Sequence, residues 1–414
     1  MSKSDKLFLF DNHLDFAQKT FLFSVSLSLG LGKWGAWIGL PKMGIFVIDV
    51  LFFCSLLFFK ISGQSSRQRS LIFTLLVSSF ILFQFLRSDD FSIVLRIRDL
   101  LPFIYILFIP LITNLLKSIN IYNLISCMRA GVLICLGWTI PVMLGIIHPV
   151  QAPKAFFGVP IFTNRYDLTG IVLAIGIIVF MEYKQFNLAS SQTIISVCLI
   201  VGILQSSRAA SIAVLLAFAY QTQNLIWYHK FKYFVFVLVF SIFSFFVLSV
   251  YPGTVSPILS SSSLARFGFL SESSEASVGA RSTYLARVRA TDKMLVWFRD
   301  QHQNILGVGP GTEMVQESGA LADLSGSPEV RAPHNWFIGL WVRYGITGTF
   351  IWCLGVFGNF IRTKIRVAIE WKILILIICM VSAMGVIIES PFGSLPLSVI
   401  VAMTYVNRKK DEYK

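Results

Sequence analysis

Long apolar runs recur along almost the whole chain, and they constrain its fold more than any other feature. A helix needs about 20 apolar residues to cross the hydrocarbon core of a bilayer. Runs close to that length lie near 16–32, 43–59, 70–86, 100–116, 128–147, 168–182, 190–205, 209–227, 233–251, 335–361, 371–389 and 394–407. The sequence therefore predicts an all-α polytopic membrane protein with about 12 transmembrane helices.

The composition supports the same class of protein. Of the 414 residues, 55% are hydrophobic and only 14% are charged, whereas a soluble domain carries about 25% charged residues. The net charge of +14 suggests nucleic acid at first, but most of the Lys and Arg residues lie in short loops between apolar runs. Because such charges orient membrane proteins, we expect membrane lipids and no nucleic acid as partners.

The cysteines provide no sign of a disulfide framework or a metal site. All of them fall in or beside apolar runs: Cys54, Cys127, Cys135, Cys198, Cys353 and Cys379. The chain has no Cys-x-x-Cys motif and no Cys/His cluster. We therefore expect neither a bound metal nor a cofactor.

The distribution of Lys and Arg predicts the orientation in the membrane. Cations are concentrated in the loops on the side of the N-terminus, including Lys60, Arg67, Arg69, Lys117, Lys184, Lys230, Lys232, Arg362, Lys364 and Arg366. The positive-inside rule places these loops, and both chain termini, in the cytoplasm. The long polar segment 252–333 then faces outward, with transmembrane helices 1–9 in residues 1–251 and helices 10–12 and a cytoplasmic tail in residues 334–414.

Arginine dominates the cations on the expected outer side. The short outer loops carry Arg87, Arg96, Arg98, Arg165 and Arg208, and the long segment contains a single lysine, Lys293, among several arginines. Arginine offers a planar fork of donors that matches phosphate oxygens. The alternative is that these side chains pair with acidic residues of the same loops or with lipid head groups.

The long polar segment is expected to contain an amphipathic helix from about Ser282 to Phe298. Its apolar positions recur at helical spacing, and they are Tyr284, Leu285, Val288, Leu295 and Phe298. This stripe is expected to face the rest of the protein. The same helix carries Arg287, Arg289 and Lys293, and Arg281 directly precedes it.

Two features follow this helix in the sequence. A glycine-rich run at 307–311 predicts a tight turn in which the backbone comes close to some other group. His334 stands just before an apolar run, next to Asn335, and can serve either as a base near neutral pH or as part of a helix cap.

Several stretches resemble the O-antigen ligase and polymerase superfamily. They are Asn304-Ile305-Leu306-Gly307-Val308-Gly309-Pro310-Gly311, Ala332-Pro333-His334-Asn335-Trp336, Tyr344-Gly345-Ile346-Thr347-Gly348, Gln205-Ser206-Ser207-Arg208, Gly279-Ala280-Arg281 and Phe162-Thr163-Asn164-Arg165. The resemblance implies a GT-C-like fold of the bacterial inner membrane, with a large extracytoplasmic helical loop and an active site that faces the periplasm.

The resemblance also implies an activity. It is an inverting, metal-independent glycosyl transfer from a glycan on undecaprenyl pyrophosphate to an acceptor hydroxyl at the outer leaflet. His334 would be the catalytic base, Arg208 and Arg281 would bind the pyrophosphate, and Arg165 and Arg289 are further candidates. Gly309, Asn335 and Glu389 would support the site, and the choice between Arg287 and Arg289 stays open.

Three functions remain open from the sequence. An O-antigen ligase, which we favour, uses lipid A–core as the acceptor, and a polymerase uses another lipid-linked repeat unit. A polysaccharide or lipid transporter is the non-enzymatic alternative. It would need polar residues along a path through the spans, whereas this chain has most of them at the expected outer surface.

Overall fold

The computed structural model describes residues 14–35, 38–40, 45–59, 67–88, 92–148, 161–182, 188–205, 207–223, 275–324, 335–360, 369–385 and 387–406. Apart from a short antiparallel pair of strands, β1 (Gly39–Leu40) and β2 (Ile45–Phe46), the regular structure of these residues is helical. The helices are α1 (Phe16–Gly35), α2 (Val47–Leu57), α3 (Arg67–Arg87), α4 (Ile93–Leu107), α5 (Ile109–Ser118), α6 (Ile121–Met143), α7 (Tyr166–Glu182), α8 (Leu188–Leu204), α9 (Arg208–Gln223), α13 (Glu275–Asp300), α14 (Met314–Glu317), α15 (Leu321–Leu324), α16 (Trp336–Phe357), α17 (Ile369–Met384) and α18 (Pro391–Tyr405).

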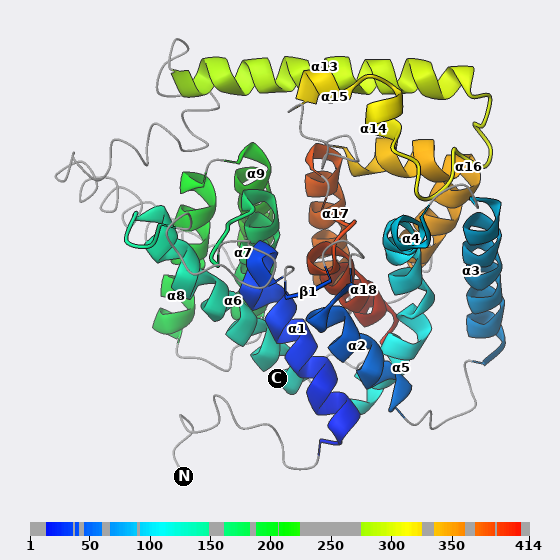
Figure 1. Ribbon diagram of the computed structural model, residues 1–414. Helices are drawn as coiled ribbons and strands as arrows, with labels where there is room; N and C mark the ends of the chain where they lie inside the picture. Colours follow the sequence, from blue (N-terminus) through cyan, green and yellow to red (C-terminus); the bar gives the residue numbers. More distant parts are fainter. Residues whose placement is uncertain are drawn as a thin grey trace.

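Most of these helices form one bundle with an apolar core, and α13 lies across one end of it (Figure 1). By length and composition, α6 and α16 can each cross a membrane, and the bent pair α4 and α5 counts as a third candidate. Further apolar helices are shorter, among them α7, α8 and α18. The helical membrane protein expected from the apolar runs is thus confirmed, whereas the number of twelve spans stays a prediction. The run at 233–251 lies outside the described residues.

The span expected at 100–116 differs in detail from the structure. The helix begins earlier, at Ile93, and bends by 45° between α4 and α5. Pro110 stands in the first turn of α5. Because proline has no backbone N–H, it cannot continue the helical hydrogen bonds of α4, and the chain changes direction there.

Asp49 is an acidic residue in an apolar helix, and its partners show a structural use. Its carboxylate accepts a hydrogen bond from the backbone N–H of Phe46, at 2.9 Å, and another from the hydroxyl of Tyr105. The first bond satisfies a free donor at the start of α2. The second ties α2 to α4, so Asp49 fixes two helices to each other.

Helix α13 confirms the helix expected near Ser282–Phe298, but the expected apolar face is partly wrong. The buried residues are Ala290, Met294 and Phe298, which pack against α14, the turn before α15, and Val342 of α16. Leu285 and Val288 are instead exposed, by 49% and 37%. The small core formed with residues 314–342 selects a stripe rotated away from the one that hydrophobicity alone suggested.

The bundle has a clear polarity relative to α13. The first half of α16 packs beneath α13. Just after the C-terminal end of α16, the Asn359 amide donates to Thr404 in the last turn of α18. Near the start of α1, the Gln18 amide donates to the Ser118 hydroxyl at the end of α5, at 3.0 Å. Helix α1 therefore begins, and α18 ends, at the end of the bundle away from α13 (Figure 1).

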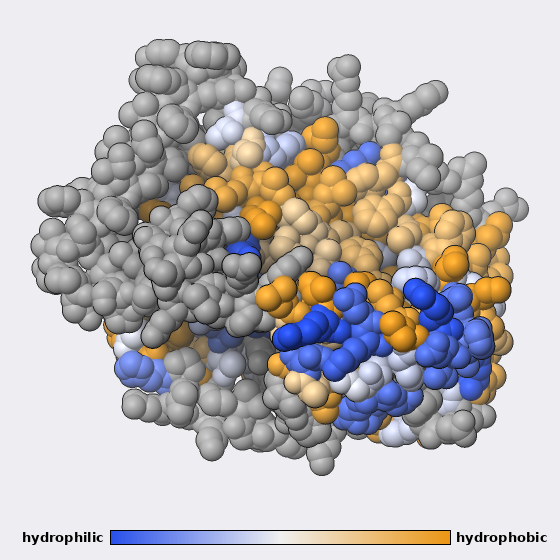
Figure 2. Space-filling model, turned by 90° about the horizontal axis from the view of Figure 1, so that it is seen from above, coloured by the Kyte–Doolittle hydropathy of each residue, from blue (hydrophilic) through white to orange (hydrophobic). Residues whose placement is uncertain are grey.

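The end of the molecule that carries α13 is not uniformly polar. Figure 2 shows this end from above, with polar residues gathered along one side and apolar residues across the middle. On α13 itself, Leu285 and Val296 are among the exposed apolar residues. Such a surface suits the boundary between a bilayer and water.

Candidate functional site

Two of the arginines expected from the sequence lie at neighbouring helix N-termini. Arg165 directly precedes α7, and Arg208 is the first residue of α9. The hydroxyl of Ser207 donates to the carboxylate of Asp167, at 2.6 Å, and so joins the two starts. Helix N-termini carry free N–H groups and a partial positive charge, so this pair of starts favours an anion.

Close packing keeps the two helices together directly behind these arginines. A Cβ on Gly170 of α7 would overlap the backbone of Ala210 of α9. The small size of both residues permits this approach, which holds the two N-termini side by side. Both arginine side chains are partly buried.

The charge on Arg165 is balanced by nearby carboxylates. Burial lowers the pKa of the Arg165 guanidinium, and the charges of Asp167 and Glu389 oppose that change. An arginine starts from so high a pKa that it keeps its charge. Glu389 thereby connects the α7 and α9 side of the site with the segment between α17 and α18.

The side chains of Arg287 and Arg289 extend from α13 in different directions. Arg287 stands one turn before the buried stripe of Ala290 and Met294, and its Nη1 lies 3.5 Å from the carbonyl oxygen of Met384 at the end of α17. Arg289 has an exposed side chain, at 67%, and pairs with Asp323 of α15 at 3.7 Å. The structure therefore directs Arg287 toward the bundle and Arg289 away from it.

Arg281 and His334 are less fully described. The backbone of Arg281 lies in the first part of α13, and its side chain is outside the description. His334 lies outside the described residues, which resume at Asn335. Asn335 caps α16, because its side-chain oxygen accepts from the N–H groups of Phe337 and Ile338 at 3.0 and 3.2 Å. The cap fixes where α16 begins, two residues after His334.

The glycine-rich turn docks on a break in α16. The helix is interrupted at Gly345, where φ is 63°. The carbonyls of Val342 and Arg343 accept from the N–H groups of Val308 and Gly309, at 3.0 and 2.9 Å. In return, the N–H groups of Ile346 and Thr347 donate to the carbonyls of Asn304 and Ile305, at 3.0 and 3.1 Å.

This exchange confirms the close backbone approach expected at 307–311. A Cβ on Gly345 would overlap the carbonyl of Ile305, and one on Gly307 would overlap the backbone at Arg343. Gly309, with φ at 99°, has the Ser88 hydroxyl 2.6 Å from the position of a Cβ. Gly307 and Gly345 are thus needed because backbone meets backbone here, and Gly309 because its positive φ and the Ser88 side chain leave no room for a Cβ.

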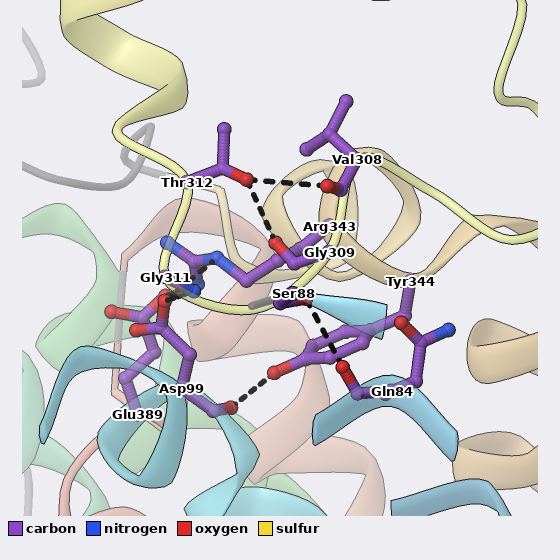
Figure 3. A network of polar contacts seen from close by, with 10 residues as sticks. All are labelled: Gln84, Ser88, Asp99, Val308, Gly309, Gly311, Thr312, Arg343, Tyr344 and Glu389. Carbon is purple, nitrogen blue, oxygen red and sulfur yellow. Dashed lines mark hydrogen bonds and ion pairs between the residues drawn. The ribbon is translucent and has the colours of Figure 1, made fainter. Parts of the chain in front are cut away.

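A buried ion-pair network lies directly beneath this turn (Figure 3). The guanidinium of Arg343 lies 3.4 Å from the carboxylate of Asp99 and 3.1 Å from that of Glu389. The same Asp99 carboxylate accepts a hydrogen bond from the N–H of Gly311 at 2.9 Å. The backbone carbonyl of Asp99 accepts another from the Tyr344 hydroxyl. The side chain of Arg343 is only 2% exposed, and that of Asp99 is 5% exposed.

Two other arginines expected on the outer side have structural partners. Arg87, at the end of α3, donates to the carbonyls of Leu306 and Gly307 and to the side chain of Gln303. Arg96 donates to the carbonyl of Phe85 at 2.8 Å and lies over the ring of that residue. Both side chains are therefore engaged within the protein, which favours a structural role over phosphate binding for Arg87 and Arg96.

Sequence reasoning missed Arg343, Asp99 and the direction of Arg287. The acidic partners come from segments far apart in the sequence, so no local motif signals the network. In the parts of the chain that the structure describes, no three His, Cys, Asp or Glu residues gather closely enough to hold a metal ion.

The fold and this site define a class, a helical membrane protein with an arginine-rich polar site at one end of its bundle. The sequence model of the protein family described as O-antigen ligase matches residues 193–353. The match runs from α8 through α13 to most of α16, and it confirms the resemblance of the motifs to the O-antigen ligase superfamily. A comparison with curated proteins gave no match.

At the level of this family, the chain is a membrane glycosyltransferase of the ligase or polymerase type. The match covers the glycine-rich turn, the break in α16 and Arg208. Asp99, Arg165 and Glu389 lie outside the matched residues, although the structure brings them to the same end of the bundle.

Proposed function

We propose that the protein transfers a glycan from undecaprenyl pyrophosphate to an acceptor hydroxyl at the outer leaflet of the bacterial inner membrane, and that it is an O-antigen ligase. The acceptor is then lipid A–core. The reaction is inverting and needs no metal, since arginine guanidinium groups rather than a metal ion stabilise the departing pyrophosphate. Both termini lie in the cytoplasm, and α13 lies on the periplasmic side.

The observation that carries the proposal is the pairing of the N-termini of α7 and α9. Each start contributes the positive end of a helix dipole and one arginine, Arg165 or Arg208, and the Ser207–Asp167 bond holds the two together. Negative charge develops on the pyrophosphate as it departs, and a preorganised positive site stabilises that charge most strongly in the transition state. Arg287 reaches the bundle from α13. Arg281 of the same helix is proposed because of its family motif, and Arg289 is the weaker candidate because it pairs with Asp323.

The chemistry also needs a base for the acceptor hydroxyl. His334 is proposed for this role because it directly precedes the Asn335 cap, at the start of α16. Imidazole accepts a proton near neutral pH. Glu389 is the less suitable base, because its carboxylate is already engaged in an ion pair with Arg343 at 3.1 Å.

The glycolipids of a deletion strain distinguish ligase from polymerase. Loss of a ligase leaves long polymer on undecaprenyl pyrophosphate and lipid A–core without polymer. Loss of a polymerase leaves lipid A–core that bears a single repeat unit. Electrophoresis of lipopolysaccharide together with analysis of the undecaprenyl-linked pool gives the answer, and a normal profile in both pools would refute the two functions.

A transporter is separated from an enzyme by a test with purified protein. Transfer of glycan from lipid-linked donor to acceptor in detergent micelles needs neither an ion gradient nor a nucleotide. We expect product under these conditions. Its absence, together with movement of lipid-linked glycan across sealed vesicles, would favour the transporter.

A further inference from the structure

Arg343 connects four separate parts of the chain at the break in α16. It belongs to the last turn before Gly345, and its guanidinium meets Asp99 of α4 and Glu389 of the segment before α18. Through the Asp99 carboxylate, it is also linked to the N–H of Gly311 in the glycine-rich turn. Its own backbone carbonyl accepts from Gly309.

The position of this network decides how the first half of α16 is held. At Gly345 the helical hydrogen bonds are interrupted, so the segment Trp336–Tyr344 is aligned by its contacts rather than by a continuous helix. These contacts include Trp336 and Phe337 against Trp352 of the second half, and Val342 beneath α13. At the far end those contacts are the backbone exchange with 304–309 and the ion pairs of Arg343.

The near end of the same segment carries the Asn335 cap and follows His334 directly. A short helix is stiff along its axis, so a change of angle at Arg343 moves its other end. A displacement of a reacting group by about 1 Å can lower the rate of an enzyme about 100-fold. The ion pairs therefore act on the location of the candidate base without touching the substrate.

We infer that Arg343 is a positioning residue: with Asp99 and Glu389, it sets the angle of the first half of α16 and so the placement of His334. This inference rests on the proposed transfer reaction. A lysine cannot replace Arg343, because two carboxylates on different sides require the planar fork of a guanidinium. The ion pair of Arg343 with Asp99 is buried away from water. Replacing one partner by a neutral side chain therefore leaves an uncompensated charge, which is strongly unfavourable.

The test compares purified full-length variants in the detergent transfer assay, after transfer by the unaltered protein has been established. Arg343→Lys, Asp99→Asn and Glu389→Gln are measured for kcat, for KM of the lipid-linked donor and for the thermal midpoint. Asp99→Asn keeps nearly the same volume and retains an oxygen for the Gly311 N–H. We expect kcat of Arg343→Lys and Asp99→Asn to fall about 100-fold, with little change in KM.

Arg129→Lys is the matched control. Arg129 is also 2% exposed, in α6, and its guanidinium contacts the Val179 carbonyl and the Phe180 ring. Its replacement is expected to lower the thermal midpoint and to leave kcat of the folded protein unchanged. The comparison separates positioning from a general cost of altering a buried arginine.

No transfer by the unaltered protein would refute the proposed function itself. Normal kcat in folded Arg343→Lys or Asp99→Asn would overturn the positioning role alone. If none of the three variants folds, the network is a folding requirement, and the inference is equally overturned. A fall in kcat equal to that of Arg129→Lys would have the same meaning.

Discussion

Two arginines, Arg208 and Arg281, are the residues whose replacement tests the donor site most directly. A lysine keeps the charge but loses the bidentate fork. Because these contacts act on a developing anion, we expect each Arg→Lys change to raise the barrier by on the order of 2–4 kcal/mol. Steady-state transfer with purified protein gives the measurement. Arg299→Lys, at the exposed end of α13, is the control, and near-normal rates in both site variants would assign these arginines to topology or lipid contact.

His334 is tested at the same scale by two substitutions. His334→Ala is expected to nearly abolish transfer and to leave donor binding intact, since the proposed role is removal of a proton. His334→Gln retains a hydrogen-bonding group but cannot take up the proton, so it separates a base from a helix cap. Transfer by the Gln variant close to that of the unaltered protein would make His334 structural and would direct attention to another base.

At the scale of elements, the docking of the glycine-rich turn on α16 predicts a sharp difference between glycines. Gly345→Ala places a Cβ against the Ile305 carbonyl, in a backbone conformation that itself costs about 1–3 kcal/mol for residues other than glycine. We expect a lower thermal midpoint in detergent and a loss of transfer. Gly319→Ala is the matched control, because Gly319 has φ at 69° but no atom within 4 Å of a Cβ. Equal effects of the two changes would mean that strain alone, and not the close approach, matters.

The sequence predicted these elements well where local patterns decide them. The apolar runs predicted the helices, and the glycines at 307–311 predicted a close backbone approach. The network of Arg343 could not be predicted, because Asp99 and Gly311 are 212 positions apart and only the folded bundle brings them together. The prediction of the buried face of α13 was partly wrong for a related reason. Ala290 and Met294 contribute little to a hydrophobic pattern, and they are buried because the small core beneath the helix packs against them.

At the scale of the whole molecule, the orientation in the membrane is open to a direct test. A single cysteine replacing Ser325 is expected to react with an impermeant thiol reagent in intact spheroplasts, because the positive-inside distribution places 252–333 outside. The native cysteines are removed first. Cysteines placed near Lys60 or Lys364 serve as the internal control and should react only after lysis. Protection of position 325 until lysis would invert the topology and move the proposed site to the cytoplasm.

The exchanged hydrogen bonds between 304–309 and the break in α16 also bear on how the chain is made. Residues 304–309 are synthesised before residues 342–347, so the carbonyls of Asn304 and Ile305 and the N–H groups of Val308 and Gly309 cannot form these bonds until α16 has followed. The turn and the helix must therefore form as one cooperative unit. In amide hydrogen exchange, we expect Val308, Gly309, Ile346 and Thr347 to become protected together and to open together, at a rate that differs from that of exposed α13 amides. Separate opening of the two segments would show that the turn is held by Arg87 and α3 instead.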